Sequence, residues 1–89
     1  MIESEALVAN DLGLHLRAAT FLVQRATRFV SDIKLAVDGE LADAKSILGL
    51  LMLGLEKGTR VRIQVSGADE RQASRAIQET FEERFGEDI

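Results

Sequence analysis

The sequence has no cysteine, proline, tryptophan or tyrosine, and it contains a single histidine. The absence of cysteine excludes a disulfide framework, a thiolate zinc site and thiol catalysis, and it favours a reducing compartment. One histidine cannot assemble a histidine-based metal site, so we expect neither a metal nor another cofactor.

Strong positive charge and long apolar runs are also lacking. Acidic residues outnumber basic residues by 15 to 11, which gives a formal net charge of −4, and the only aromatic residues are four phenylalanines. Such a chain offers nucleic acid neither attraction for its phosphates nor platforms for base stacking. No apolar run reaches the roughly 18 residues of a membrane span, and no N-terminal export signal is visible. We therefore expect a cytoplasmic protein with no nucleic-acid partner and no membrane insertion.

The length of 89 residues predicts one domain over residues 1–89. A chain of this size buries only about 60% of the surface that it exposes when unfolded. It therefore has one modest core and no room for an enclosed catalytic cavity, so any reactive group must lie near the surface.

Four short segments have the apolar patterns of strands. These segments are residues 6–9, 32–37, 40–43 and 59–66. Asp38-Gly39, between the second and third segments, is a preferred pair for a tight hairpin turn. In the last segment apolar residues alternate with polar ones, which predicts a strand with one buried face and one wet face.

Two helices are predicted in the first two thirds of the chain. The first begins at Leu16 and lasts about three turns, with an apolar stripe that extends to Val30. The second follows Ser46, a preferred N-cap residue, in an apolar stretch that runs to Leu55.

A third helix is predicted near the end of the chain. Asp69 and Gln72 resemble a capping box at its start, and its apolar stripe extends to Phe85, just before Gly86. Acidic residues gather beyond and within its last turn, and we expect them to form a solvated tail. They are Glu82, Glu83, Glu87 and Asp88.

The predicted order of elements is β-α-β-β-α-β-α. Four strands with apolar residues on one side need only one layer of helices. We therefore expect an α+β fold, an open-faced β-sandwich in which three helices cover one side of a four-stranded antiparallel sheet. A split βαβ arrangement leaves a slot for the last strand between the first two.

His15 is the candidate reactive residue. It follows a loop that contains Gly13 and directly precedes the first predicted helix. The first turn of a helix presents unpaired N–H groups and a positive dipole end, and Arg17 adds a guanidinium, so a phosphoryl group on His15 would be stabilised. A neutral imidazole is nucleophilic near pH 7 without an auxiliary base. By residue type and position alone, a histidine at a helix start is more often simply solvated.

The segment Gly13-Leu14-His15-Leu16-Arg17-Ala18-Ala19 resembles the phosphorylation-site motif of the HPr family, the histidine-containing phosphocarriers of the bacterial phosphoenolpyruvate:sugar phosphotransferase system. The resemblance extends over essentially the whole chain. It includes Asn10, residues 44–47, residues 53–55 and residues 57–59.

This resemblance implies an open-faced β-sandwich and a carrier that is not itself an enzyme. It implies that His15 takes a phosphoryl group through Nδ1 from phosphorylated enzyme I and passes it to IIA domains, and that Arg17 steadies the group. Ala18 stands where many relatives have proline. Proline is tolerated in the first turn of a helix but is not required there, so we expect the site to survive.

Ser46 has two compatible interpretations. As an N-cap it would begin the second helix. The segment Ala44-Lys45-Ser46-Ile47 also resembles the site at which HPr kinase/phosphorylase modifies HPr, which implies regulatory phosphorylation of Ser46. A phosphate at a helix N-terminus is tolerated by the dipole, so its effect would come from charge beside a binding surface.

The second helix carries apolar residues on two arcs. Leu50 and Leu53 fall on one arc. A short helix on a one-layer core cannot bury both arcs, so one arc should be exposed. The alternative to an exposed arc is a segment that is buried on all sides because its glycines bend it. The other arc is a candidate docking face, and the family resemblance adds Thr20 to it and implies docking of enzyme I and IIA domains. The docking residues are Thr20, Ile47, Leu48, Leu51 and Met52.

Three other functions remain open. A nitrogen-related or regulatory paralogue would pass phosphate to a regulatory IIA protein rather than drive sugar uptake. A small acylphosphatase-type hydrolase also suits the order of elements, although Asp11 in the first loop would repel phosphate. A regulatory module without phosphorylation would use only the apolar face. For the phosphocarrier we expect a monomer.

Overall fold

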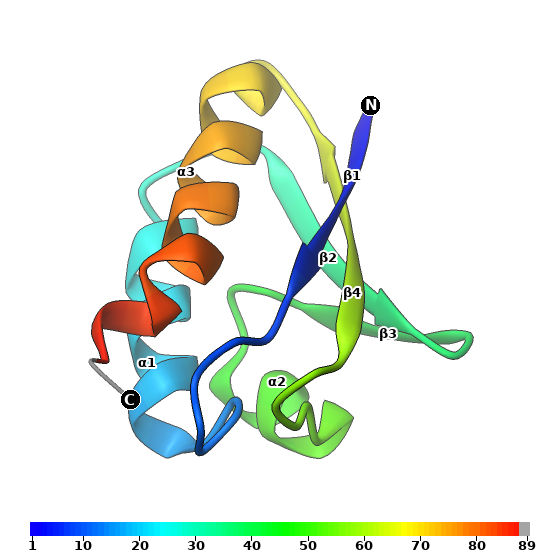
Figure 1. Cartoon of the computed structure of the whole chain (residues 1–89). Helices are drawn as coiled ribbons and strands as arrows, with labels where there is room; N and C mark the ends of the chain where they lie inside the picture. The colour runs from blue at the N-terminus through cyan, green and yellow to red at the C-terminus, as the bar shows by residue number, and fades with distance from the viewer. Residues whose placement is uncertain (88–89) are drawn as a thin grey trace.

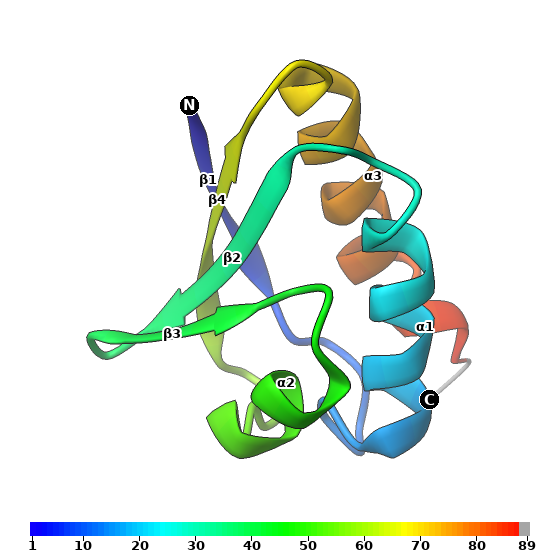
Figure 2. The same cartoon turned by 180° about the vertical axis from the view of Figure 1, so that it is seen from behind.

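A computed structural model describes residues 1–87, and within them four strands and three helices follow one another in the predicted order. The elements are β1 (Ile2–Leu7), α1 (Leu16–Ala26), β2 (Asp32–Val37), β3 (Glu40–Asp43), α2 (Ile47–Leu53), β4 (Arg60–Ser66), α3 (Glu70–Glu82) and the 3-10 turn η1 (Arg84–Gly86). In the described part of the chain, all helices lie on one side of the sheet, with α1 beside α3, and no helix covers the other side (Figures 1 and 2). Within residues 1–87, no helix has the length and apolar character needed to cross a membrane.

The sheet has the strand order β1-β4-β2-β3, and every neighbouring pair is antiparallel. β4 therefore lies between β1 and β2, in the slot that the sequence predicted. Val65 shows this placement, because it lies opposite Ile2 on one side and Ile33 on the other. The turn between β2 and β3 is formed by Asp38 and Gly39, which both have positive φ angles, of 52° and 82°.

The first strand was predicted in the wrong place. It spans Ile2–Leu7 instead of residues 6–9, because its backbone pairs with β4 along its whole length, from Ile2 opposite Val65 to Leu7 opposite Arg60. One face of β1 is only partly covered, so its apolar pattern is weak. The last strand begins at Arg60, one residue later than predicted.

The core lies between the sheet and the helices. Val61, Ile63 and Val65 of β4 are fully buried, as their alternation predicted. Leu22 of α1 is fully buried as well, but Val30 is 78% exposed, so the stripe does not reach it. The reason is that α1 ends at Ala26 and the chain turns toward β2 before Val30.

α3 begins directly after Asp69, as predicted, but the capping contact and the end of the helix differ from the prediction. The Asp69 side chain does not cap the helix; its carboxylate accepts hydrogen bonds from the backbone of Val30 and Ser31, both at 3.0 Å, and from the Ser31 hydroxyl. The Ser31 hydroxyl is the main cause of a lowered pKa of Asp69. The helix ends at Glu82, and Phe85 is buried from the separate turn η1.

Candidate functional site

His15 is the residue directly before α1, at the N-cap position. Its backbone is extended, with φ −77° and ψ −179°, and its side chain makes no capping hydrogen bond. The first hydrogen bond of the helix joins Ala19 N to His15 O at 2.8 Å, so the N–H groups of residues 16–18 precede the helical ladder. The imidazole is 30% exposed. A partner can therefore reach the ring, and an anion on it would meet the positive end of α1.

The loop before His15 is held against the segment that follows α2. Leu14 is buried, and its N–H donates to Leu55 O at 2.9 Å. Gly13 has a φ of +66°, and a Cβ at this position would lie 2.5 Å from Leu55 O. Gly13 is therefore required both for its left-handed backbone and for the close approach of its loop to the segment that contains Leu55.

We expect Gly13→Ala to lower the free energy of unfolding by about 1 to 3 kcal/mol through overpacking, in addition to the strain of the left-handed backbone. Gly54→Ala is the matched control. Gly54 has a nearly equal φ of +65°, but nothing lies within 4 Å of a Cβ there. Urea unfolding of both variants separates the steric effect from the backbone effect. Equal losses in the two variants would show that the contact with Leu55 is unimportant.

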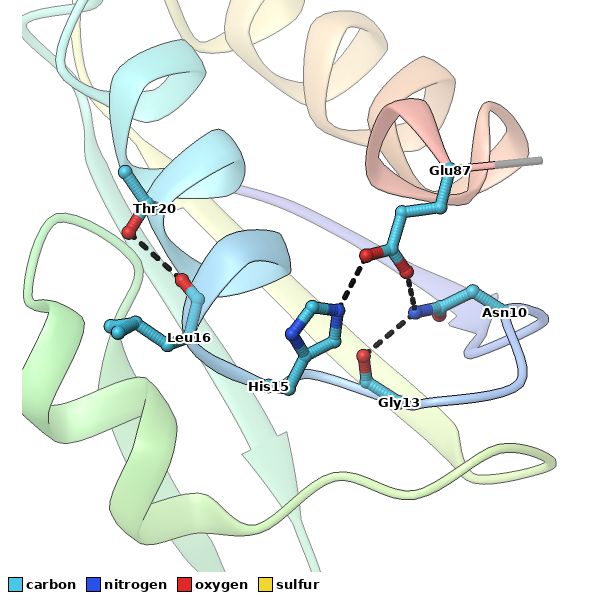
Figure 3. Close-up of polar contacts among 6 residues, drawn as sticks. All are labelled: Asn10, Gly13, His15, Leu16, Thr20 and Glu87. Carbon is cyan, nitrogen blue, oxygen red and sulfur yellow. Dashed lines mark hydrogen bonds and ion pairs between the residues drawn. The ribbon is translucent and has the colours of Figure 1, made fainter. Parts of the chain in front are cut away.

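Arg17 and Thr20 lie on α1 close to His15. Arg17 is exposed and lines the same surface hollow as His15. The hydroxyl of Thr20 donates to Leu16 O at 2.8 Å, one turn from the start of the helix (Figure 3). The structure thus brings together His15, Arg17 and Thr20, which were all predicted to belong to the site.

The apolar residues of α2 divide between core and surface. Leu50 is fully buried and Leu53 packs against the core from a partly buried position. The prediction of two arcs is confirmed, and burial on all sides is wrong. The exposed fractions of the outer arc are 36% for Ile47, 68% for Leu48, 37% for Leu51 and 76% for Met52.

Two further apolar side chains near His15 are exposed and were not predicted. Leu12 is 62% exposed and Leu16 is 60% exposed, and both line the hollow beside the imidazole. The apolar spacing of α1 could not identify Leu16, because the first residue of a helix lies beyond the part that packs on the core.

Ser46 is the N-cap of α2, as predicted. Its backbone is extended, and its side-chain oxygen accepts a hydrogen bond from Gly49 N at 3.0 Å. The residue is partly buried and directly precedes Ile47 and Leu48. A modification of Ser46 would therefore place its charge at the edge of the exposed apolar arc.

Glu87 does not belong to a solvated tail. Its side chain is only 8% exposed and contacts Nε2 of His15, and it accepts a hydrogen bond from Asn10 Nδ2 at 2.8 Å (Figure 3). Glu83 pairs with Arg25 at 3.5 Å, and Asp88 lies outside the described residues. No local pattern could have identified Glu87, because 72 residues separate it from His15.

Comparisons with known proteins agree on one family. Residues 2–83 match the family model PTS-HPr, described as the PTS HPr component phosphorylation site. The chain is 44% identical over 88 residues to "Phosphocarrier protein HPr" of Xylella fastidiosa, covering 99% of both chains. The crystal structure of HPr-C-His from Thermoanaerobacter tengcongensis is 37% identical, has a TM-score of 0.95 and covers 100% of both chains. An HPr dimer from the same organism is 38% identical, with a TM-score of 0.78, and covers 98% of this chain and 100% of that one.

Proposed function

Because the chain belongs to the HPr family, the phosphocarriers of the bacterial phosphotransferase system, we propose that His15 accepts a phosphoryl group from phosphorylated enzyme I and passes it to IIA domains. One observation carries the assignment to this residue. The only imidazole of the chain is accessible and stands at the N-terminus of α1, beside Arg17. In this role the protein is a substrate of its partner enzymes and not an enzyme itself.

The helix and Arg17 supply the chemistry that a phosphorylated histidine needs. The N–H groups of residues 16–18, which precede the helical ladder, can donate to the phosphoryl oxygens, and the helix dipole favours the added negative charge by about 0.3 to 1 kcal/mol. The Arg17 guanidinium can add charge-assisted hydrogen bonds. Because the site is open, these groups hold the phosphoryl group without enclosing it, which suits its transfer to a second partner.

We propose that partners dock on an apolar surface beside His15. Its predicted members are Thr20, Ile47, Leu48, Leu51 and Met52, and the exposed Leu12 and Leu16 extend it to the imidazole. Exposed apolar side chains gathered around a reactive group are typical of interaction sites. Docking there would bring the active site of a partner to Nδ1.

We also propose Ser46 as a site of regulatory phosphorylation by an HPr kinase/phosphorylase. A phosphate carries about −1.5 to −2 charges at pH 7 and would lie beside Ile47 and Leu48. It would weaken docking by placing charge next to an apolar contact, while α2 would persist because its N-terminus tolerates the anion.

The acceptor role is tested by incubating the protein with phosphoenolpyruvate and a cognate enzyme I. We expect one acid-labile, base-stable phosphate per chain, which peptide mass spectrometry places on His15. A phosphate on any other residue, or none, would contradict the proposal. Hydrolysis of a simple acyl phosphate in proportion to protein would instead support the acylphosphatase alternative. Asp11, the acidic residue of the first loop that speaks against that alternative, accepts a hydrogen bond from Lys57 Nζ at 2.6 Å.

The nitrogen-related or regulatory paralogue is the second candidate within the same family. Transfer rates from the sugar-type and the nitrogen-type enzyme I distinguish the two, because the correct donor should react faster. We propose a monomer for the transfer reaction, since docking to partners needs the apolar surface free. Sedimentation at the concentrations of the transfer assay tests this, and a dimer would contradict it.

A further inference from the structure

The turn η1 brings Glu87 onto the ring of His15 (Figure 3). Three successive residues before Glu87 have positive φ angles: Arg84 (54°), Phe85 (54°) and Gly86 (78°). This conformation is unfavourable for residues with a Cβ, so tertiary contacts must hold it. Burial of the Phe85 side chain, which is 1% exposed, is one such contact.

The same turn is packed closely against α1. A Cβ on Gly86 would lie 2.8 Å from Cε2 of Phe21, so only glycine allows this approach without a shift of the ring. The Phe21 ring also stacks against the guanidinium of Arg25, 4.7 Å from the ring centroid, and Arg25 pairs with Glu83. The position of Glu87 therefore follows from the burial of Phe85 and the packing of Gly86 against Phe21.

Asn10 orients the carboxylate of Glu87. It is fully buried, and its Nδ2 donates to Glu87 Oε1 at 2.8 Å and to Gly13 O at 2.7 Å. Turning the amide over would place its oxygen against two acceptors, so the direction of these hydrogen bonds is determined. The second carboxylate oxygen, Oε2, is thereby directed at Nε2 of His15.

The charge of Glu87 determines which nitrogen of His15 carries the proton. Burial acts to raise the pKa of Glu87, but hydrogen bonds from Asn10 and His15 and the nearby charges of His15 and Arg17 outweigh it, so the pKa lies below its usual value. The ionised carboxylate can only accept a hydrogen bond. A neutral imidazole beside it therefore carries its proton on Nε2 and keeps a lone pair on Nδ1.

We infer that Glu87 is a positioning residue for phosphoryl transfer, because it selects the tautomer of His15 whose Nδ1 is a free nucleophile. This inference rests on the proposed role of His15 as phosphoryl acceptor. Figure 3 shows Nδ1 on the side of the ring that faces Leu16 and the N-terminus of α1. Glu87 thus directs the lone pair to the place where the helix would bind the phosphoryl group.

The same contact assists the charge change of the reaction. The Nδ1 lone pair forms the new N–P bond while the bond between phosphorus and the donor atom of the phosphorylated partner breaks, and that electron pair stays on the donor. The ring keeps its Nε2 proton and gains one positive charge. The Glu87 carboxylate opposes this charge, as a carboxylate does when it orients a catalytic or metal-bound imidazole.

The variant Glu87→Gln tests the inference. Its side-chain oxygen must accept the hydrogen bond from Asn10, so its amide NH₂ faces Nε2 of His15 and moves the ring proton to Nδ1. We expect ¹⁵N NMR of the full-length protein, at a pH where the imidazole is neutral, to show the reversed tautomer. The rate of phosphoryl transfer from enzyme I should fall by about 10- to 100-fold.

The matched control is Glu82→Gln, which removes the same charge from an exposed position at the end of α3. It should leave both the tautomer and the transfer rate unchanged. If Glu87→Gln keeps the wild-type tautomer and rate while His15 is labelled, this inference alone is overturned. If the wild-type protein shows no phosphate on His15, the proposed function fails and the role of Glu87 in transfer fails with it.

Discussion

Replacement of His15 by alanine is expected to abolish phosphoryl acceptance, leaving label at the background of an enzyme I reaction without carrier. No second imidazole exists in the chain to replace it. The fold should persist, because the His15 side chain is 30% exposed and does not cap α1. We expect the free energy of unfolding to fall by only about 1 to 2 kcal/mol, since Glu87 loses one of its polar partners.

Two measurements on the same sample are needed to interpret this variant. Acid-labile label is quantified after incubation with phosphoenolpyruvate and enzyme I, and urea unfolding reports stability. Asn10→Ala is a useful comparison, because it removes the other partner of Glu87 and leaves the imidazole in place. Undiminished acid-labile label in the His15→Ala protein would end the assignment of this residue. A protein that has lost its cooperative unfolding would show instead that His15 has a structural role.

A pair of leucines on α2 should give opposite results. Leu50→Ala removes a fully buried side chain and is expected to lower the free energy of unfolding by about 2 to 5 kcal/mol. Leu48→Ala truncates a side chain that is 68% exposed and should change the free energy of unfolding by no more than about 0.5 kcal/mol. The same Leu48→Ala change should weaken binding to enzyme I by about 1 kcal/mol or more, which is about fivefold in the dissociation constant.

The two leucines are close in sequence and lie on one helix, so each variant is the control for the other. Urea unfolding measures the stability of both, and calorimetric titration with enzyme I measures binding under conditions where both are folded. Weakened stability with unchanged binding in Leu48→Ala would contradict the division of α2 into a buried and a docking side. Unchanged stability in Leu50→Ala would contradict its place in the core.

Several elements could be predicted because their signals are local. Asp38-Gly39 predicted the hairpin turn since few residue pairs adopt positive φ at two successive positions, and both do so here. The alternation of β4 predicted its buried face, since neighbouring side chains of a strand point to opposite sides. Ser46 predicted the start of α2 in the same way, because its capping hydrogen bond reaches only to Gly49.

The failed predictions concern contacts between segments that are distant in sequence. β1 was misplaced because pairing with β4, and not its own apolar pattern, determines its length. The spacing of Asp69 and Gln72 predicted a capping box at the start of α3, but the Asp69 carboxylate instead accepts hydrogen bonds from the backbone of Val30 and Ser31, which precede β2. In both cases the partner lies far away along the chain, so spacing within a window of residues carries no information about it.

The sequence by itself determined the order of the elements, the helix start that presents His15 with Arg17, and the two arcs of α2. These follow from periodicity and capping, which depend on neighbouring residues only. Only the tertiary structure decided what contacts the imidazole. Glu87 reaches His15 because packing of Phe85 and Gly86 holds the turn η1 after α3, and because the buried Asn10 directs the carboxylate. Such a contact depends on where two distant segments meet, and that is determined by the burial of the core as a whole.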